Sequence, residues 1–243
     1  MNTTTAPQLY ADEEVSSSYT YPEGHRPRSI AEQVASLREL FPALKDATFD
    51  ESIATRPLPE GAEGWFAIPR PEKLAPTNNA AVEAVLNRLA ETRSFHNYRL
   101  GQLGPERLRQ SDRTVHALDL IGQAQKGHDI LIVPAQFGKR HRGRSVRRAR
   151  EVFTPNEFGL GAYEVGIMLL THPERLTSSE DLWIDCAGDE YSGGGQFDGA
   201  PYFGFDVGQL SFDTYWSDGA RARYGSSSGF LPPALPQLQR GGQ

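Results

Sequence analysis

Apolar residues recur at helical spacing in two parts of the N-terminal half. Residues 29–40 begin with Ser29 followed three positions later by Glu32, the spacing of a capping box, and then carry an apolar stripe. Residues 77–92 begin with Thr77, another capping residue, and again place their aliphatic side chains on one stripe. The pattern predicts a helix over each range.

Two further helices are predicted in the middle of the chain. One opens at Gly104-Pro105, because proline suits the first position of a helix, and closes at Gly127. The other runs over residues 156–170, with Asn156 as its cap. Apolar residues surround most of its circumference, so we expect it to be the central buried helix.

Strand patterns separate these helices. Residues 64–68 form a short aromatic and β-branched run that predicts a strand. Residues 129–133 and 182–187 are apolar runs, which are typical of buried strands. Residues 210–216 alternate apolar and polar positions instead. Because a turn signal, Asp218-Gly219, follows directly, we expect a hairpin that returns after it through residues 220–224.

This alternation of helices and strands predicts an α/β fold. We expect a small central sheet with buried strands near 129–134 and 182–187, flanked by helices, and an antiparallel Gly- and aromatic-rich appendage over 188–230. A single domain would then span 29–230. Residues 1–28 lack apolar periodicity and are expected to be disordered or loosely draped. Residues 231–243 are rich in proline and glutamine and are expected to be disordered.

The composition of the chain indicates the cellular compartment in which we expect the protein. The chain has 243 residues, and its single cysteine, Cys186, excludes an internal disulfide framework. The first residues resemble no signal peptide, and no apolar run approaches the ~18 residues that a membrane span requires. We therefore expect a cytoplasmic protein with no membrane partner.

Charge is unevenly distributed along the chain. Lysine and arginine total 25 against 31 acidic residues, a net charge of −6. Seven of these cations gather within twelve positions, namely Lys139, Arg140, Arg142, Arg144, Arg147, Arg148 and Arg150. Without them 25 − 7 = 18 basic residues would face 31 acidic ones, a net charge of −13. An acidic body with one basic segment favours a local anion site over a generally basic nucleic-acid coat.

The basic segment predicts a site for nucleic acid or another phosphate-bearing ligand. Its sequence predicts a loop followed by a helix that begins at Ser145, so free backbone N–H groups would lie near the arginines. The planar guanidinium of arginine can hold two phosphate oxygens. The candidate residues are Lys139, Arg140, His141, Arg142, Arg144, Arg147 and Arg148. The glycines and lysine of a P-loop are missing.

Two other interpretations of this segment stay open. In the first, the segment is an ordinary solvated face of the protein, and its arginines pair with carboxylates of the acidic body. Alternatively, it can dock onto the acidic body of a second copy, with the helix over 156–170 packing at the interface of a non-catalytic homo-oligomer.

A cluster of carboxylates suggests a third hypothesis. Asp185, Asp189 and Glu190 follow or end the predicted strand 182–187, and strand ends are where α/β proteins place ligands. Carboxylates there can bind Mg²⁺ or Mn²⁺, which would make the protein a phosphoester hydrolase. This requires the strands near 129–134 and 182–187 to be parallel neighbours. The other interpretation is a turn with ordinary surface acids.

Aromatic residues are also candidates for ligand contacts. Six of them could stack nucleobases beside the arginines or fill a small β core: Phe95, Tyr98, Tyr202, Phe203, Tyr215 and Trp216. The core interpretation is favoured. No residue pattern supports a Ser-His-Asp or Cys-His nucleophile.

Overall fold

Two β-sheets and five α-helices make up the computed structural model, which describes residues 8–233 together with residues 235 and 238. The first sheet has the strand order β1-β4-β11-β5, and all its pairs are antiparallel. Its strands are β1 (Gly64–Pro69), β4 (Ile130–Gln136), β5 (Glu157–Gly159) and β11 (Ser228–Phe230). Every position of β4 is buried, as the continuous apolar run predicts.

The second sheet mixes parallel and antiparallel pairs. Its main path is β10-β6-β8-β7-β3, and β9 joins it by pairing with both β8 and β2. The pairs β10–β6 and β2–β9 are parallel, whereas the others are antiparallel. Its strands are β2 (Phe95–Asn97), β3 (Leu108–Gln110), β6 (Trp183–Asp185), β7 (Asp189–Tyr191), β8 (Gly199–Asp206), β9 (Gln209–Trp216) and β10 (Tyr224–Ser226).

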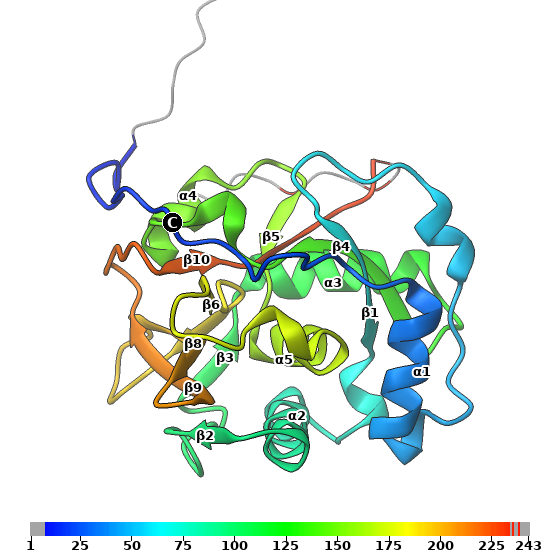
Figure 1. Cartoon of the computed structure of the whole chain (residues 1–243). Coiled ribbons are helices and arrows are strands. Elements are labelled where there is room, and N and C mark those ends of the chain that lie inside the picture. The colour runs from blue at the N-terminus through cyan, green and yellow to red at the C-terminus, as the bar shows by residue number, and fades with distance from the viewer. Residues whose placement is uncertain (1–7, 234, 236–237, 239–243) are drawn as a thin grey trace, which may run out of the picture.

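Helix α5 (Ala162–Thr171) lies at the centre of the molecule, and all ten of its residues are buried (Figure 1). It packs against α1, α2 and β1. The other helices are α1 (Ile30–Leu40), α2 (Asn78–Thr92), α3 (Asp112–Ala124) and α4 (Val146–Val152). Single 3₁₀ turns are η1 (Pro42–Leu44), η2 (Glu51–Thr55), η3 (Pro71–Lys73), η4 (Lys139–His141) and η5 (Pro173–Arg175).

The predicted α/β class is confirmed, and so are the elements with strong local signals. Helix α1 begins with the expected capping box, in which the Ser29 hydroxyl accepts from the Glu32 amide and the Glu32 carboxylate accepts from the Ser29 amide. Thr77 caps α2 by accepting a hydrogen bond from the Ala80 amide. Strands β1, β4, β6 and β9 lie where the apolar patterns predict them.

The helix predicted over 156–170 begins later than expected. Residues Glu157–Gly159 form β5, and α5 starts only at Ala162. Gly159 lies so close to the backbone of Ala187 that a β-carbon there would be 2.3 Å from it. Two carboxylates then receive the first amides of the helix: Glu164 accepts from Gly161, and Asp189 accepts from Ala162. The packing of two loops, rather than Asn156, therefore sets this helix start.

The helix predicted from Pro105 also begins later. Residues Leu108–Gln110 form β3, paired with β7, and Ser111 caps α3 by accepting a hydrogen bond from the Thr114 amide. A capping serine followed by an acidic first turn outweighs the preference of proline for a helix start.

The C-terminal part, predicted as an antiparallel appendage within the single domain, contributes strands to both sheets. Strand β9 forms its hairpin with β8, which precedes it, and the turn lies at Val207-Gly208. The chain after Asp218 enters β10 beside β6, and then β11 in the first sheet. Residues 188–230 thus connect both sheets.

This topology also corrects the expected central sheet. The predicted strands near 129–134 and 182–187 are β4 and β6, and they belong to different sheets. They are therefore not parallel neighbours.

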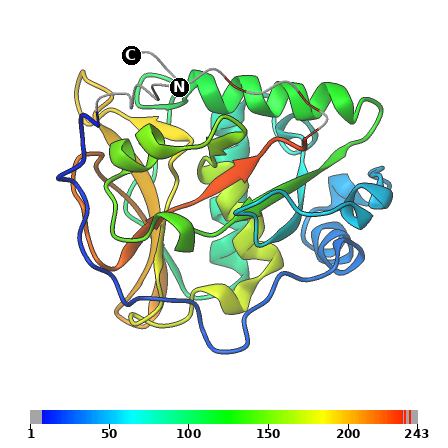
Figure 2. The same cartoon turned by 90° about the horizontal axis from the view of Figure 1, so that it is seen from above.

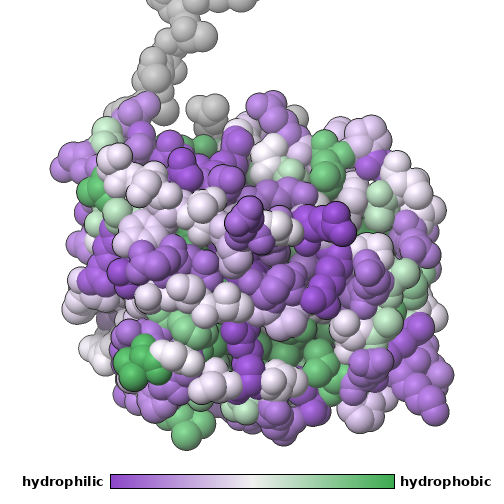
Figure 3. Space-filling model, in the orientation of Figure 1, coloured by the Kyte–Doolittle hydropathy of each residue, from purple (hydrophilic) through white to green (hydrophobic). Residues whose placement is uncertain are grey.

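Residues 8–28, expected to be disordered or loosely draped, lie along the surface of the body, and we call them the N-terminal strap. The strap crosses one side of the molecule from α4 to the start of α1, as two perpendicular views show (Figures 1 and 2). Isolated β-bridges join Glu14 to Arg144 and Thr20 to Asp181. Hydrophilic residues cover most of the face that it crosses (Figure 3).

The remaining terminal predictions fall largely outside the described residues. This holds for residues 1–7 and for most of the expected tail at 231–243. Among the described residues, no helix has the length and apolar character needed to cross a membrane.

Candidate functional site

The arginine-rich segment leaves β4 through a tight glycine contact. Gly138 has a φ of 120° and lies against the backbone of Gly225, where a β-carbon would be 2.4 Å from the Gly225 carbonyl oxygen. The turn η4 follows, and Ser145 then caps α4 by accepting from the Arg148 amide. The predicted loop and helix are both present, and they lie directly under the strap.

Three arginines of this segment form ion pairs with acidic residues of the strap, and we call Arg144, Arg147 and Arg148 the arginine surface. The Nε of Arg147 lies 2.7 and 2.8 Å from the two carboxylate oxygens of Glu13, and its Nη2 also donates to Glu13. Arg148 donates to Glu14 at 2.5 Å, and Arg144 lies 3.3 Å from the same carboxylate. Two neighbouring acids of the strap thus occupy all three arginines.

The contacts with the arginines lower the pKa values of Glu13 and Glu14. Burial raises the pKa of Glu13, but hydrogen bonds from Arg147 and Ser145, together with the charge of Arg147, outweigh it. The pKa of Glu13 therefore lies below its ordinary value. The pKa of Glu14 is lowered in the same way, because the contacts with Arg148 and Arg144 outweigh its burial. Both acids are bound as carboxylates near neutral pH.

Arg140 and His141 face a different carboxylate. Glu157 is fully buried, and His141 Nε2 lies 2.8 Å from one of its oxygens. Arg140 Nε lies 3.4 Å from the other, and the Ser228 hydroxyl donates at 2.6 Å. Burial lowers the pKa of His141 despite this carboxylate, and the ring is 2% exposed. His141 is thus part of a buried network and does not lie on the surface that a ligand would meet.

The other cations of the segment divide into exposed and buried ones. Lys139 and Arg142 are exposed, although Arg142 donates to the Tyr19 carbonyl of the strap. Arg150 instead donates to the backbone carbonyls of Ala187 and Asp189. A guanidinium bound to two carbonyls connects α4 to the second sheet and is structural.

Backbone amides near the start of α4 already have partners. The Ser145 amide donates to the Glu13 carbonyl, and the Arg147 amide donates to the Ser217 carbonyl. The Arg148 amide donates to the Ser145 hydroxyl. The side chains of the arginines, rather than free N–H groups of a helix start, are therefore the groups that a ligand can reach by displacing the strap.

The structure does not bring the three predicted metal ligands together. Asp189 points to the start of α5 and accepts from the Ala162 amide, whereas Glu190 pairs with Arg109 at 2.8 Å. Successive residues of a strand face opposite ways, so these two carboxylates diverge. Among residues 8–233, 235 and 238, no group of three or more His, Cys, Asp or Glu side chains could hold a metal ion.

Two of these acids are instead buried in the body. Burial raises the pKa of Asp185 to about 7, against the charges of Arg221 and Arg150. Burial and the nearby Glu164 raise the pKa of Asp189 to about 8. One Asp189 oxygen, Oδ1, makes no hydrogen bond to any described residue. Such carboxyl groups bind protons more readily than a metal ligand should.

Some of the candidate aromatic side chains are buried, and others are exposed. Phe203 is fully buried, and Tyr202 stacks on Trp183 inside the second sheet. Tyr215 and Trp216, at the end of β9, are 38% and 60% exposed. These two residues lie next in the chain to Ser217, whose carbonyl accepts from the Arg147 amide of α4 at 3.0 Å. Tyr98 is also exposed, but it follows β2.

Sequence reasoning missed the strap as a partner. Its acidic pair, Glu13 and Glu14, lies about 130 positions before the arginines that bind it, so no local pattern connects the two segments. The excess of acid in the rest of the chain was the one available signal.

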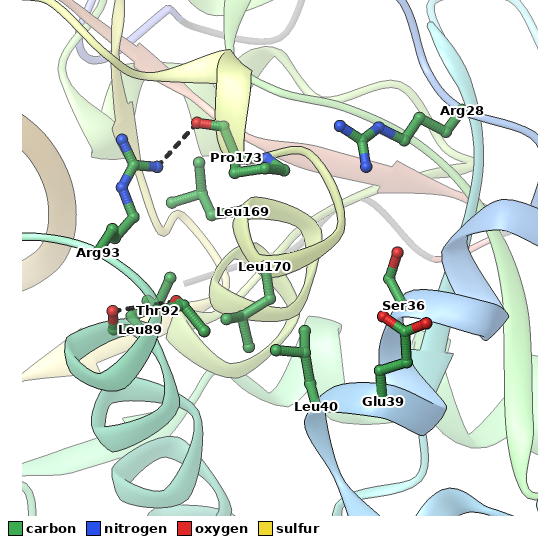
Figure 4. Close-up of a pocket in the computed structure, with 10 residues that line it drawn as sticks. All are labelled: Arg28, Ser36, Glu39, Leu40, Leu89, Thr92, Arg93, Leu169, Leu170 and Pro173. Carbon is green, nitrogen blue, oxygen red and sulfur yellow. Dashed lines mark hydrogen bonds between the residues drawn. The ribbon is translucent and has the colours of Figure 1, made fainter.

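A separate hollow of about 260 Å³ lies between α1, α2 and α5. Leucine side chains from the three helices line it, with Arg28 and Arg93 at its margin (Figure 4). Arg93 donates to the carbonyls of Pro173 and Leu176, so it holds the loop after α5. The sequence predicts Leu89 and Leu169 as buried helix positions, but it predicts no site here.

The fold and the surface together define an α/β protein whose arginine-rich segment is bound by an acidic N-terminal strap. No protein-family model matches the chain, and no curated protein or solved structure matches it. Any statement of its function therefore depends on its own residues.

Proposed function

We propose that this protein binds a polyanion, either nucleic acid or another polyphosphate, through its arginine-rich segment. The observation that supports this most is the occupancy of the arginine surface by Glu13 and Glu14. The surface can bind two adjacent anions in defined geometry. In this proposal the strap fills the site until a polyanion displaces it.

Phosphate suits this surface as well as carboxylate does. Arg147 binds both oxygens of one carboxylate, and a phosphodiester presents two free oxygens in a similar arrangement. Lys139, Arg140 and Arg142 lie at the exposed side of the same segment and would extend the cationic path. A ligand with several phosphates would engage more of these cations than the two strap acids do.

The test is binding of labelled oligonucleotides and of inorganic polyphosphate at two salt concentrations. We expect binding that weakens with salt, with a logarithmic slope of about −0.7 to −0.9 for each phosphate neutralised. The double variant Glu13→Gln/Glu14→Gln should bind several-fold more tightly, because the competing carboxylates are gone. The double variant Arg144→Gln/Arg147→Gln should bind more weakly.

Matched controls separate competition from a change of net charge. Glu23→Gln/Glu83→Gln also removes two exposed carboxylates, and Arg88→Gln removes a cation that pairs with Glu91 on α2. These variants should change affinity by less than about twofold. No binding at low salt, even by Glu13→Gln/Glu14→Gln, would rule out the proposal.

A homo-oligomer is less well supported. The helix that we expected at its interface is α5, and all its residues are buried within one copy. The form of this hypothesis that uses the arginine surface is a dimer in which the strap of one copy binds the arginines of the other. Sedimentation at low salt tests for this dimer, because strap exchange predicts an association that Glu13→Gln/Glu14→Gln abolishes.

A further inference from the structure

The strap places an aromatic ring as well as carboxylates on the arginine surface. The guanidinium carbon of Arg147 lies 4.5 Å from the centre of the Tyr10 ring. The edge of the same guanidinium binds Glu13. One arginine therefore binds an anion at its edge while its guanidinium carbon lies over an aromatic ring.

This pair of contacts matches the chemistry of a nucleotide. A nucleotide carries a planar aromatic base and a phosphate within a short distance, and arginine can stack on the first while it binds the second. Inorganic polyphosphate offers only the anion. In a duplex the faces of the bases are covered by their neighbours in the stack, so the ring contact is accessible only in a single strand.

Further aromatic surface adjoins Arg147. The Arg147 amide donates to the Ser217 carbonyl, and Tyr215 and Trp216 immediately precede Ser217. Arg221 stacks on the Tyr215 ring, with its guanidinium carbon 3.4 Å from the ring centre. Trp216 is 60% exposed. A strand that leaves Arg147 in this direction would meet a second stacking platform.

The strap can leave this surface at moderate cost. Its aliphatic residues on either side of the acidic pair, Leu9 and Val15, are 65% and 44% exposed. Ion pairs and hydrogen bonds hold this part instead. Each main pair joins a half-exposed side chain to a more buried one, with exposed fractions of 38% and 13% for Arg147–Glu13 and of 34% and 8% for Glu14–Arg148. Such pairs should contribute about 1 kcal/mol each, the upper end of the range for surface pairs. An incoming strand with several phosphates and bases can replace such contacts.

We infer that the arginine surface is a binding site for single-stranded nucleic acid, and that residues 8–18 of the strap occupy it as an internal imitation of that ligand. This inference rests on the proposed function and narrows it to one class of polyanion. Arg147 is the residue that would distinguish nucleic acid from other polyphosphates, because its face meets the base.

The experiment compares four probes of similar charge on the Glu13→Gln/Glu14→Gln protein. They are a single-stranded oligothymidine, an abasic strand of equal length, a duplex and inorganic polyphosphate. We expect the base-bearing strand to bind at least about fivefold more tightly than the abasic strand, since one stacked base contributes that much or more. The duplex should bind no more tightly than the abasic strand.

The variant Arg147→Lys tests the ring contact directly. Lysine keeps the charge but has no planar face, so the preference for the base-bearing strand over the abasic strand should fall to about twofold or less. Affinity for inorganic polyphosphate should change by less than about threefold. Thermal melting of the variant, compared with its parent, checks that the fold is retained.

The possible outcomes separate the two proposals. Equal binding of all four probes, or a preference for the duplex, overturns the inference and leaves polyanion binding intact. A base preference that Arg147→Lys does not reduce also overturns it. Binding of none of the four probes overturns both proposals.

Discussion

The two halves of the strap are held by different forces. Residues 8–18 contact the body through polar groups, while their aliphatic side chains stay largely in solvent. Glu13 and Glu14 pair with the arginine surface, and the Leu9 and Tyr10 amides donate to the Glu151 carboxylate. Residues 19–28 insert side chains into the body. The Tyr21 hydroxyl donates to Glu63 at 2.6 Å, and the His25 side chain is only 2% exposed.

The second half completes a buried charge network. Arg175 is fully buried, and its guanidinium carbon lies 3.8 Å from the centre of the Tyr21 ring. The His25 ring packs 5.6 Å from Phe137 and 6.1 Å from His172. The comparison shows that a segment held by charge can exchange with other anions, whereas a segment held by burial anchors the chain beside it.

The largest expected effect comes from breaking the anchored half. Tyr21→Ala removes a ring stacked on Arg175 and the donor to Glu63, so a fully buried cation and a partly buried carboxylate lose partners. We expect a loss of about 3 kcal/mol in the free energy of unfolding, measured by urea denaturation. Tyr10→Ala, the matched change in the acidic half, should cost less than about 1 kcal/mol. Equal losses would contradict the comparison.

The sequence predicts the elements whose signals are local. The capping box of α1 and the apolar run of β4 depend on neighbouring residues, and both are where we expect them. The start of α5 depends on Asp189, which accepts from Ala162 across 27 positions. No periodicity encodes such a contact, so the sequence predicts a longer helix.

Part of the candidate site was predictable from the sequence, and part was not. The cation run is visible in the sequence, and its fold as a loop followed by a capped helix is predicted correctly. Its partners are not visible, because Glu13 and Glu14 lie in a segment without apolar periodicity. Lack of periodicity excludes a regular element with a buried face, but it does not exclude an extended segment held by ion pairs.

Acid should loosen the anchored half before the acidic half. Burial, with the charges of Arg175, His172 and Arg28, lowers the pKa of His25 from 6.5 to about 4, and only Glu174 opposes this. The unfolded chain therefore binds a proton that the folded chain does not, and stability falls as the pH drops from about 6.5 to 4. The pKa values of Glu13 and Glu14 lie below 4.5, so their contacts persist through most of that window.

Denaturation at pH 7 and pH 5 tests this order. His25→Asn cannot titrate, so it should lose less stability than the natural chain between these two pH values, by a margin smaller than the effect of Tyr21→Ala. His172, whose pKa is also lowered to about 4, will keep part of the pH dependence in the variant. An unchanged pH dependence in His25→Asn would mean that this ring does not contribute.

Removal of the charges should free the acidic half alone. Glu13→Gln/Glu14→Gln should change the free energy of unfolding by less than about 1 kcal/mol, because the body does not depend on these pairs. Hydrogen exchange at the Val15 amide, which donates to the Gly143 carbonyl, should accelerate at least about tenfold. Exchange over residues 21–26 should stay constant. High salt should produce the same pattern in the natural chain.

The smallest effect should come from the aliphatic residues of the acidic half. Leu9 and Val15 are largely exposed, so Leu9→Ser and Val15→Ser should each change the free energy of unfolding by less than about 0.5 kcal/mol. Leu37→Ala, at a fully buried position of α1, provides the contrast and should cost about 2–5 kcal/mol. If either serine variant cost more than about 1 kcal/mol, apolar burial would contribute to holding residues 8–18. The strap would then be harder to displace than its ion pairs alone imply, and exchange with a polyanion would need a correspondingly stronger ligand.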